Sequence, residues 1–168
     1  MSFEPSPTLD MSSPAAKRAS YALLLEQTRA LLTGERDWLA NLAQFSALVF
    51  QTVPSLNWAG FYLARGDELV VGPFQGKVAC VRIAFGRGVC GACANTREIQ
   101  RVEDVHAFAG HIACDSASNS ELVLPLVLGD RLLGVFDLDS PELARFSEED
   151  QAGFAAMVQV LLESTDWP

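Results

Sequence analysis

Apolar side chains near the start of the chain recur every three or four residues, which is the spacing of one helix face. A first helix is predicted from Ser20 to Gly34, where the glycine ends it, and a second from Glu35 to Pro54. Residues 1–19 are rich in proline and serine, so we expect them to form a disordered N-terminal tail. The apolar faces of the two helices consist of Tyr21, Leu24, Leu25, Leu31 and Leu32, and of Trp38, Leu42, Phe45 and Val49.

From residue 57 onward, side chains of similar character recur at every second position, as in a half-buried strand. Trp58 and Tyr62 then point to one face of this strand, and Phe61 points to the other. Two later apolar runs flank Gly129-Asp130, a two-residue turn typical of a hairpin. We expect strands at 57–63, 68–71, 79–83, 121–128 and 131–138, a small strand within 98–105, a short helix at 89–96 and a last helix after Ser147.

This order of elements predicts an α+β fold. Neighbouring strands are joined by tight turns, so the sheet should be mostly antiparallel, with helices packed on it. The chain has 168 residues and no internal repeat, and we expect residues 20–168 to form a single domain.

The net charge of −9 arises because 12 lysines and arginines oppose 21 acids. It argues against binding to nucleic-acid phosphates and to anionic membranes. No apolar run is long enough to span a membrane, and the N-terminal residues have no signal-peptide pattern. We therefore expect a cytoplasmic protein, in which structural disulfides are uncommon.

Four cysteines, Cys80, Cys90, Cys93 and Cys114, could then be buried, redox-active, nucleophilic or metal-binding. Cys90 and Cys93 form a C-x-x-C inside a G-x-G-x-x-G stretch that begins at Gly86. Without a βαβ unit around it, this stretch indicates a turn into a helix rather than a dinucleotide site, and a thiol at that helix N-terminus would have a stabilised thiolate. A structural zinc site usually needs a second pair of nearby ligands, so we expect no bound metal.

Cys114 lies in the least regular part of the chain, residues 97–119. A long structured loop inside a compact domain is usually functional. His111 could tune the Cys114 thiol or bind a substrate carboxylate, although a loop histidine such as His106 or His111 is more often solvent-facing or hydrogen-bonded.

Three carboxylates are predicted to meet at one end of the last hairpin. Asp137 and Asp139 share a face of the second strand, and counting outward from the turn places Glu121 opposite Leu138, level with both. Crowded carboxylates raise one another's pKa, which keeps one protonated as a proton donor while the others could hold an ammonium group. Trp58 and Tyr62, on one face, could box an apolar or cationic ligand group or belong to the core.

Taken together, these motifs resemble the free methionine-(R)-sulfoxide reductases, which are small enzymes built on a GAF domain. The similarity runs from about Tyr21 to the last helix. It rests on NWAGFY at 57–62, GRGVCG at 86–91, Asp104-Val105, GHIACD at 110–115, S-x-S-E at 118–121 and GVFDLD at 134–139. The resemblance implies a GAF-type, six-stranded antiparallel sheet with helices packed on it.

The resemblance also implies the reaction, which is reduction of free L-methionine-(R)-sulfoxide to methionine. Cys114 corresponds to the attacking thiol, and Cys80 and Cys90 correspond to the candidate resolving thiols. The substrate pocket corresponds to Trp58, Tyr62, Glu121, Asp137 and Asp139. Cys93 lies outside the family pattern and could compete with Cys90 in disulfide formation.

The resemblance further implies that thioredoxin, recharged by NADPH through thioredoxin reductase, is the external reductant and that no cofactor is bound. A homodimer also belongs to what it implies. Two alternatives remain open at this point: a non-catalytic GAF module that binds a small molecule as a sensor, and an interaction domain stabilised by zinc on Cys90 and Cys93.

Overall fold

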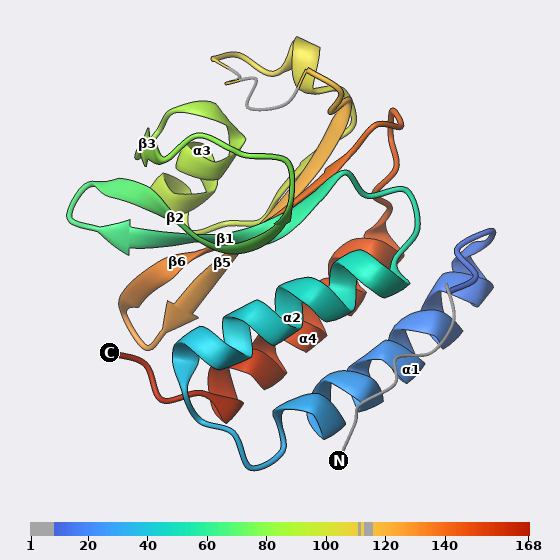
Figure 1. Cartoon of the computed structure of the whole chain (residues 1–168). Coiled ribbons are helices and arrows are strands. Elements are labelled where there is room, and N and C mark those ends of the chain that lie inside the picture. The colour runs from blue at the N-terminus through green and yellow to red at the C-terminus, as the bar shows by residue number, and fades with distance from the viewer. Residues whose placement is uncertain (1–8, 111, 113–115) are drawn as a thin grey trace.

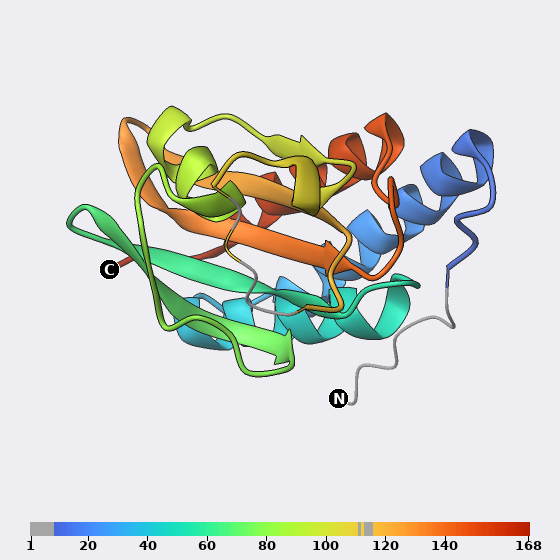
Figure 2. The same cartoon turned by 90° about the horizontal axis from the view of Figure 1, so that it is seen from above.

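The computed structural model describes residues 9–110, 112 and 116–168. A six-stranded sheet separates a thick layer of long helices from a thinner layer on its other face (Figure 1). No helix in the described part of the chain is long and apolar enough to cross a membrane. The long helices are α1 (Pro14–Leu32), α2 (Trp38–Thr52) and α4 (Glu148–Ser164), with α1 packed mainly on α4; the short helix α3 (Gly88–Thr96) lies on the opposite face (Figures 1 and 2).

The strands of the sheet follow the order β3-β2-β1-β6-β5-β4, and every neighbouring pair is antiparallel. This architecture confirms the predicted α+β fold. The predicted elements are present, although β2 continues further than expected and β3 begins later. Their bounds are β1 Trp58–Arg65, β2 Glu68–Gly76, β3 Arg82–Ala84, β4 Gln100–Val102, β5 Ser120–Leu128 and β6 Arg131–Ser140, with a 3-10 turn at Val105–Ala107.

The alternation of side chains along β1 supplies a core on each face of the sheet. Phe61 is fully buried among the long helices, where its ring packs against Phe45 and Phe136. Trp58 and Tyr62 point to the other face, where α3 covers them. The predicted division of this strand is therefore confirmed, and it is the second, thinner layer that contains the chemically interesting side chains.

Helix α1 begins at Pro14, six residues before the predicted start at Ser20. The Ser13 side chain caps the helix by accepting a hydrogen bond from the Ala16 N–H, and proline is favoured in a first turn because it has no N–H to satisfy. Leu9 is buried, and its N–H donates to the Thr52 carbonyl. The predicted disordered tail is therefore wrong for residues 9–19, and residues 1–8 lie outside the described residues.

A buried ionic cluster fastens the start of α1 to the start of α4. Its centre is Asp150, which is fully buried and bonded to Lys17, to Arg145 at 3.0 Å and to the Tyr21 hydroxyl at 2.7 Å. Burial alone would raise the pKa of the Asp150 carboxyl, but the bonds from Lys17, the Ser147 N–H and Tyr21 lower it overall. Asp150 is therefore ionised in the folded protein and holds three segments together.

Candidate active site

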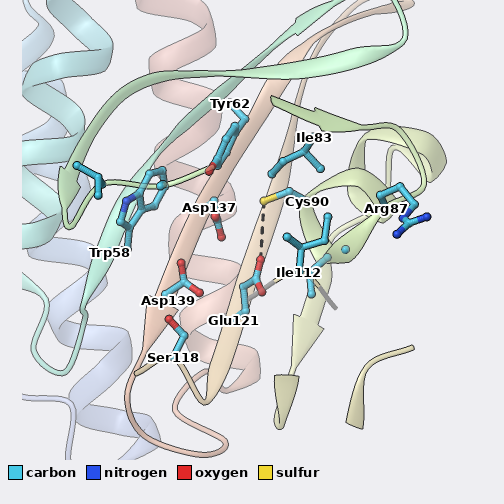
Figure 3. Close-up of a pocket in the computed structure, with 14 residues that line it drawn as sticks. Trp58, Tyr62, Ile83, Arg87, Cys90, Ile112, Ser118, Glu121, Asp137 and Asp139 are labelled. Atoms are coloured by element: carbon cyan, nitrogen blue, oxygen red, sulfur yellow. Dashed lines mark hydrogen bonds between the residues drawn. The ribbon is translucent and has the colours of Figure 1, made fainter. Parts of the chain in front are cut away.

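A pocket lies between the sheet and α3, and the predicted substrate residues meet in it (Figure 3). It encloses about 520 Å³ of space between atoms, part of which is open solvent. The central strands build one wall and the first turn of α3 builds the other. The predicted residues in the lining are Trp58 and Tyr62 from β1, Glu121 from β5, Asp137 and Asp139 from β6, and Cys90 from α3.

The observed register of the hairpin places all three carboxylates on one face of the sheet, and this register differs from the predicted one. Glu121 pairs with Asp139, whereas simple counting from the turn places it opposite Leu138. Residues directly opposite in an antiparallel pair share a face, and a shift of one residue exchanges the two faces. In the predicted register Glu121 would have pointed away from Asp137 and Asp139, so that register is wrong while the predicted cluster of acids is present.

A β-bulge causes the shift. Leu126 pairs with Gly134, but Val127 pairs with Leu132, so β6 contains one extra residue at this point. Gly134 also lies so close to β1 that a Cβ there would overlap the Tyr62 carbonyl oxygen. The bulge and this close approach together aim the carboxylates of β6 into the pocket.

Stacked aromatic rings form the side wall next to the carboxylates. The Trp58 ring lies 5.6 Å from Tyr62 and 5.1 Å from Phe74, nearly parallel to both. The indole N–H donates to the Lys77 carbonyl at 3.1 Å, which fixes the ring plane. The wall is therefore rigid and apolar, and its π-face suits a methyl group or a cation.

Burial raises the pKa values of Glu121 and Asp137, and the neighbouring aspartates raise that of Glu121 further. The pKa of Glu121 lies well above its ordinary value, first because the carboxyl is buried and then because of Asp137 and Asp139. Burial raises the pKa of Asp137 from 3.8 to about 6, and hydrogen bonding with Cys90 and Glu121 limits the rise. The Oδ1 atom of Asp137 is buried and has no hydrogen-bond partner among the described residues. The site thus offers a protonated carboxyl beside a carboxylate that is ready to bind a cation.

The thiol of Cys90 is neutral, contrary to the prediction from its place at a helix N-terminus. It is buried and donates to Glu121 Oε1 at 3.7 Å. Burial and the nearby carboxylates of Asp137 and Glu121 raise the pKa of Cys90 well above its ordinary value, which outweighs the helix dipole. Cys93, one turn further along α3, is also a buried free thiol and donates to the Val123 carbonyl.

Cys80 lies half-buried in the connection between β2 and β3, beside pocket residue Ala79, and is engaged in a disulfide. Cys114 and His111 lie outside the described residues. The ring of His106 is hydrogen-bonded to Asn119 at 3.1 Å, in agreement with the expectation for a loop histidine. Of the three predicted catalytic cysteines, Cys90 is thus in the pocket and Cys80 borders it.

Sequence reasoning overlooked several residues of the lining, among them Ile83, Arg87 and Ile112. They come from β3, from the residue that precedes α3 and from the loop before β5, and no periodicity of the chain connects these segments. The sulfur of Cys90 and one oxygen each of Glu121 and Asp137 lie within 4.8 Å of one another in the described part of the chain, a spacing that would also admit a metal ion. The spacing equally suits an ammonium group, which such carboxylates attract.

Comparisons with known proteins agree with this geometry. The GAF domain profile matches residues 40–161. The free methionine-R-sulfoxide reductase of Escherichia coli is 51% identical over 154 residues, which cover 90% of this chain and 93% of the relative. The chain belongs to the free methionine-R-sulfoxide reductase family of GAF-domain proteins.

Two further members of this family support the assignment over nearly the whole length. The enzyme of that name from Saccharomyces cerevisiae is 39% identical, and the match covers 93% of this chain and 91% of the relative. A crystal structure of the Neisseria meningitidis enzyme in complex with its substrate is 40% identical, superposes with a TM-score of 0.87 and covers 96% of this chain and 95% of that one. The predicted family and its fold are therefore confirmed.

Proposed function

We propose that this chain reduces free L-methionine-(R)-sulfoxide to L-methionine by thiol chemistry. The observation that carries the proposal is the group of three carboxylates beside the Trp58 ring. Crowding acidic side chains in a pocket does not stabilise the fold, so their presence there indicates a function. The names of the E. coli and S. cerevisiae relatives and the substrate complex of the N. meningitidis enzyme support the same reaction.

The pocket offers a binding partner for each of two substrate groups, the ammonium group and the methyl group on the sulfoxide. Asp137 and Asp139 would bind the ammonium group, since the buried Asp137 Oδ1 has no hydrogen-bond partner among the described residues. The methyl group on the sulfoxide would rest on the Trp58 ring, which Tyr62 holds by stacking. A methionine sulfoxide inside a polypeptide has no free ammonium group, and a pocket that pairs this charge selects the free amino acid.

Reduction needs a nucleophile at sulfur and an acid at oxygen. In the proposed step the Cys114 thiolate attacks the sulfoxide sulfur, and Glu121 gives its proton to the sulfoxide oxygen. The S–O bond of the substrate then breaks as the hydroxyl oxygen bonds to the Cys114 sulfur, and methionine leaves. Cys114 is oxidised to a sulfenic acid, and Glu121 is left as a carboxylate. The raised pKa of Glu121 suits this role, because the carboxyl is still protonated near neutral pH.

Recycling then requires a second thiol and an external dithiol. The Cys80 thiol condenses with the sulfenic acid, which forms a disulfide and releases water. Cys80 is favoured for this step because it is disulfide-bonded, whereas Cys90 and Cys93 are buried free thiols. Thioredoxin would supply two electrons and two protons to restore both thiols by exchange. No bound cofactor is required, and the expectations of a homodimer and of a cytoplasmic location belong to the same proposal.

The proposal is tested with the separated R and S epimers of free methionine sulfoxide and thioredoxin as reductant. We expect turnover of the R epimer only, and turnover of neither or of both at equal rates would contradict the proposal. Cys114→Ser should abolish even one stoichiometric round of methionine formation. Cys80→Ser should keep that single round and lose recycling. If Cys80→Ser instead abolishes the single round and Cys114→Ser loses only recycling, Cys80 is the attacking thiol and Cys114 the resolving one.

A further inference from the structure

We propose that Cys90 is a positioning residue for the proton donor Glu121 and takes no part in disulfide exchange. The inference rests on the proposed function, since it assigns a role within that reaction. It concerns a thiol that the sequence motif alone would place among the redox cysteines.

The geometry connects the two side chains directly. Cys90 Sγ lies 3.7 Å from Glu121 Oε1, which is hydrogen-bond distance for a sulfur donor, and both side chains point into the pocket (Figure 3). Cys90 is 4% exposed and sits in the first turn of α3, so its side chain has little freedom to leave this contact. Glu121 lies on the central strand β5, and the bond across the pocket fixes the carboxyl from the opposite wall.

The surroundings keep the thiol protonated and therefore able to donate. The nearby groups are acidic or neutral: Glu121 from β5, Asp137 and Asp139 from β6, Tyr62 from β1 and Cys93 from α3. Charge on the sulfur would be repelled by these acids and would be poorly solvated. The cation in the described pocket lining is Arg87, which precedes α3 and is exposed, and the charges that act on Cys90 are those of the acids.

The same surroundings make Cys90 a poor redox partner. Disulfide exchange proceeds through a thiolate that can be reached by its partner, and Cys90 is protonated and only 4% exposed. Cys80, by contrast, is half-buried and already disulfide-bonded while Cys90 remains a free thiol.

The hydrogen bond stabilises the carboxylate that forms when Glu121 loses its proton. A donor to a carboxylate favours the ionised form, so the Cys90 S–H lowers the pKa of Glu121 against the opposing effects of burial and the two aspartates. Cys90 would thus keep Glu121 a strong enough acid to protonate the sulfoxide oxygen. A hydroxyl at this position should serve equally well, whereas a methyl group should not.

Three variants separate the possible roles: Cys90→Ser, Cys90→Ala and the matched control Cys93→Ala. Cys93 is equally buried on the same helix, but its sulfur donates to a backbone carbonyl of β5 instead of a carboxylate. Steady-state kcat and KM with thioredoxin are measured for the R epimer across pH, together with single-round methionine yield. Each variant is also compared with the wild type in urea unfolding.

We expect Cys90→Ala to lose roughly threefold to tenfold in kcat near pH 8, because one modest hydrogen bond to the acid is removed. Cys90 also lowers the pKa of Asp137, so a rise in KM should be confined to lower pH, where Asp137 gains its proton. The alkaline limb of its kcat profile should move to higher pH, because Glu121 holds its proton more tightly. Cys90→Ser should restore wild-type kcat and return the limb to the wild-type position or below it. Cys93→Ala should leave both readouts unchanged.

Two results would overturn the inference. If Cys90→Ser and Cys90→Ala both keep the single round of methionine formation and lose recycling, Cys90 is a resolving cysteine. If Cys90→Ala loses activity and stability without a shift in its pH profile, the side chain only fills space. A wild-type protein that reduces neither epimer would instead contradict the proposed function itself, so the two failures are distinguishable.

Discussion

Replacing Asp137 with asparagine should stabilise the protein while it destroys substrate binding. The pKa of the Asp137 carboxyl rises from 3.8 to about 6 on folding, and each pKa unit corresponds to about 1.4 kcal/mol. The ionised side chain therefore lowers the free energy of unfolding by about 3 kcal/mol above the folded pKa. Asparagine has the same shape and no charge, and its introduction also removes one cause of the raised pKa of Glu121.

The direction of the pH dependence follows from where the proton binds. Because the folded protein holds the Asp137 proton more tightly than the unfolded chain does, stability is lost as pH rises from about 4 through about 6. Asp137→Asn should not show this loss. The variant should therefore be about 3 kcal/mol more stable than the wild type near pH 8, and the advantage should shrink towards zero near pH 4.

Urea unfolding of the wild type and of Asp137→Asn near pH 8 and near pH 4 measures the difference between their free energies of unfolding. The titration of all unrelated groups cancels in this difference. Asp130→Asn, in the exposed turn of the same hairpin, is the control and should change the free energy of unfolding by less than about 0.5 kcal/mol. A variant that is equally or less stable than the wild type at pH 8, or an advantage that does not vary with pH, would refute the reasoning. In activity assays, KM of the wild type should rise as pH falls below about 6, because protonated Asp137 no longer attracts the ammonium group.

Three further outcomes follow from the structure. Glu121→Gln keeps the shape of the proton donor but has no acidic proton, so kcat should fall by about 10²- to 10⁴-fold in the steady-state assay. Single-round methionine formation should be slowed equally. Asp150→Ala leaves the buried Arg145 and the partly buried Lys17 without their shared anion and should lower the free energy of unfolding by about 3–5 kcal/mol in urea, whereas the exposed Asp166→Ala should change it little. Gly134→Ala should push β6 away from the Tyr62 carbonyl, which would appear as a loss of about 1–3 kcal/mol in thermal or urea unfolding together with a raised KM.

The fold could be predicted from the sequence wherever a single period governs a whole element. The alternation along β1 separates Trp58 and Tyr62 from Phe61, and the structure places them in different cores. The pattern of apolar positions does not predict the start of α1, because the segment before Ser20 is polar and proline-rich. The pair Ser13-Pro14 is nevertheless a recognised helix start, and in the structure this cap decides where the helix begins.

The site could be predicted less completely, because its properties depend on neighbours that are distant in the sequence. The bulge in β6 lies in an apolar stretch, Leu132-Leu133-Gly134, where a skipped pairing leaves no trace in the pattern of apolar positions. The pKa of Cys90 depends on carboxylates contributed by two other strands, and its position at a helix N-terminus therefore suggested the wrong protonation state. Residue types were thus predictable, whereas their relative faces and charges were not.

The placement of the acids is itself an argument for function. Glu121 and Asp137 lie on β5 and β6, central strands that have paired neighbours on both sides, and this is the part of the sheet with the least room to adjust. Folding alone would favour apolar side chains at these buried positions, as at Val123 and Val135 on the same face. A rigid support that holds crowded carboxylates destabilises the fold but keeps a proton donor and a cation site in fixed positions before the substrate arrives. The thick layer, by contrast, contains well-packed aromatics and the Asp150 cluster, which stabilise the fold. One face of the sheet therefore carries the catalytic groups, and the other face carries the stabilising contacts.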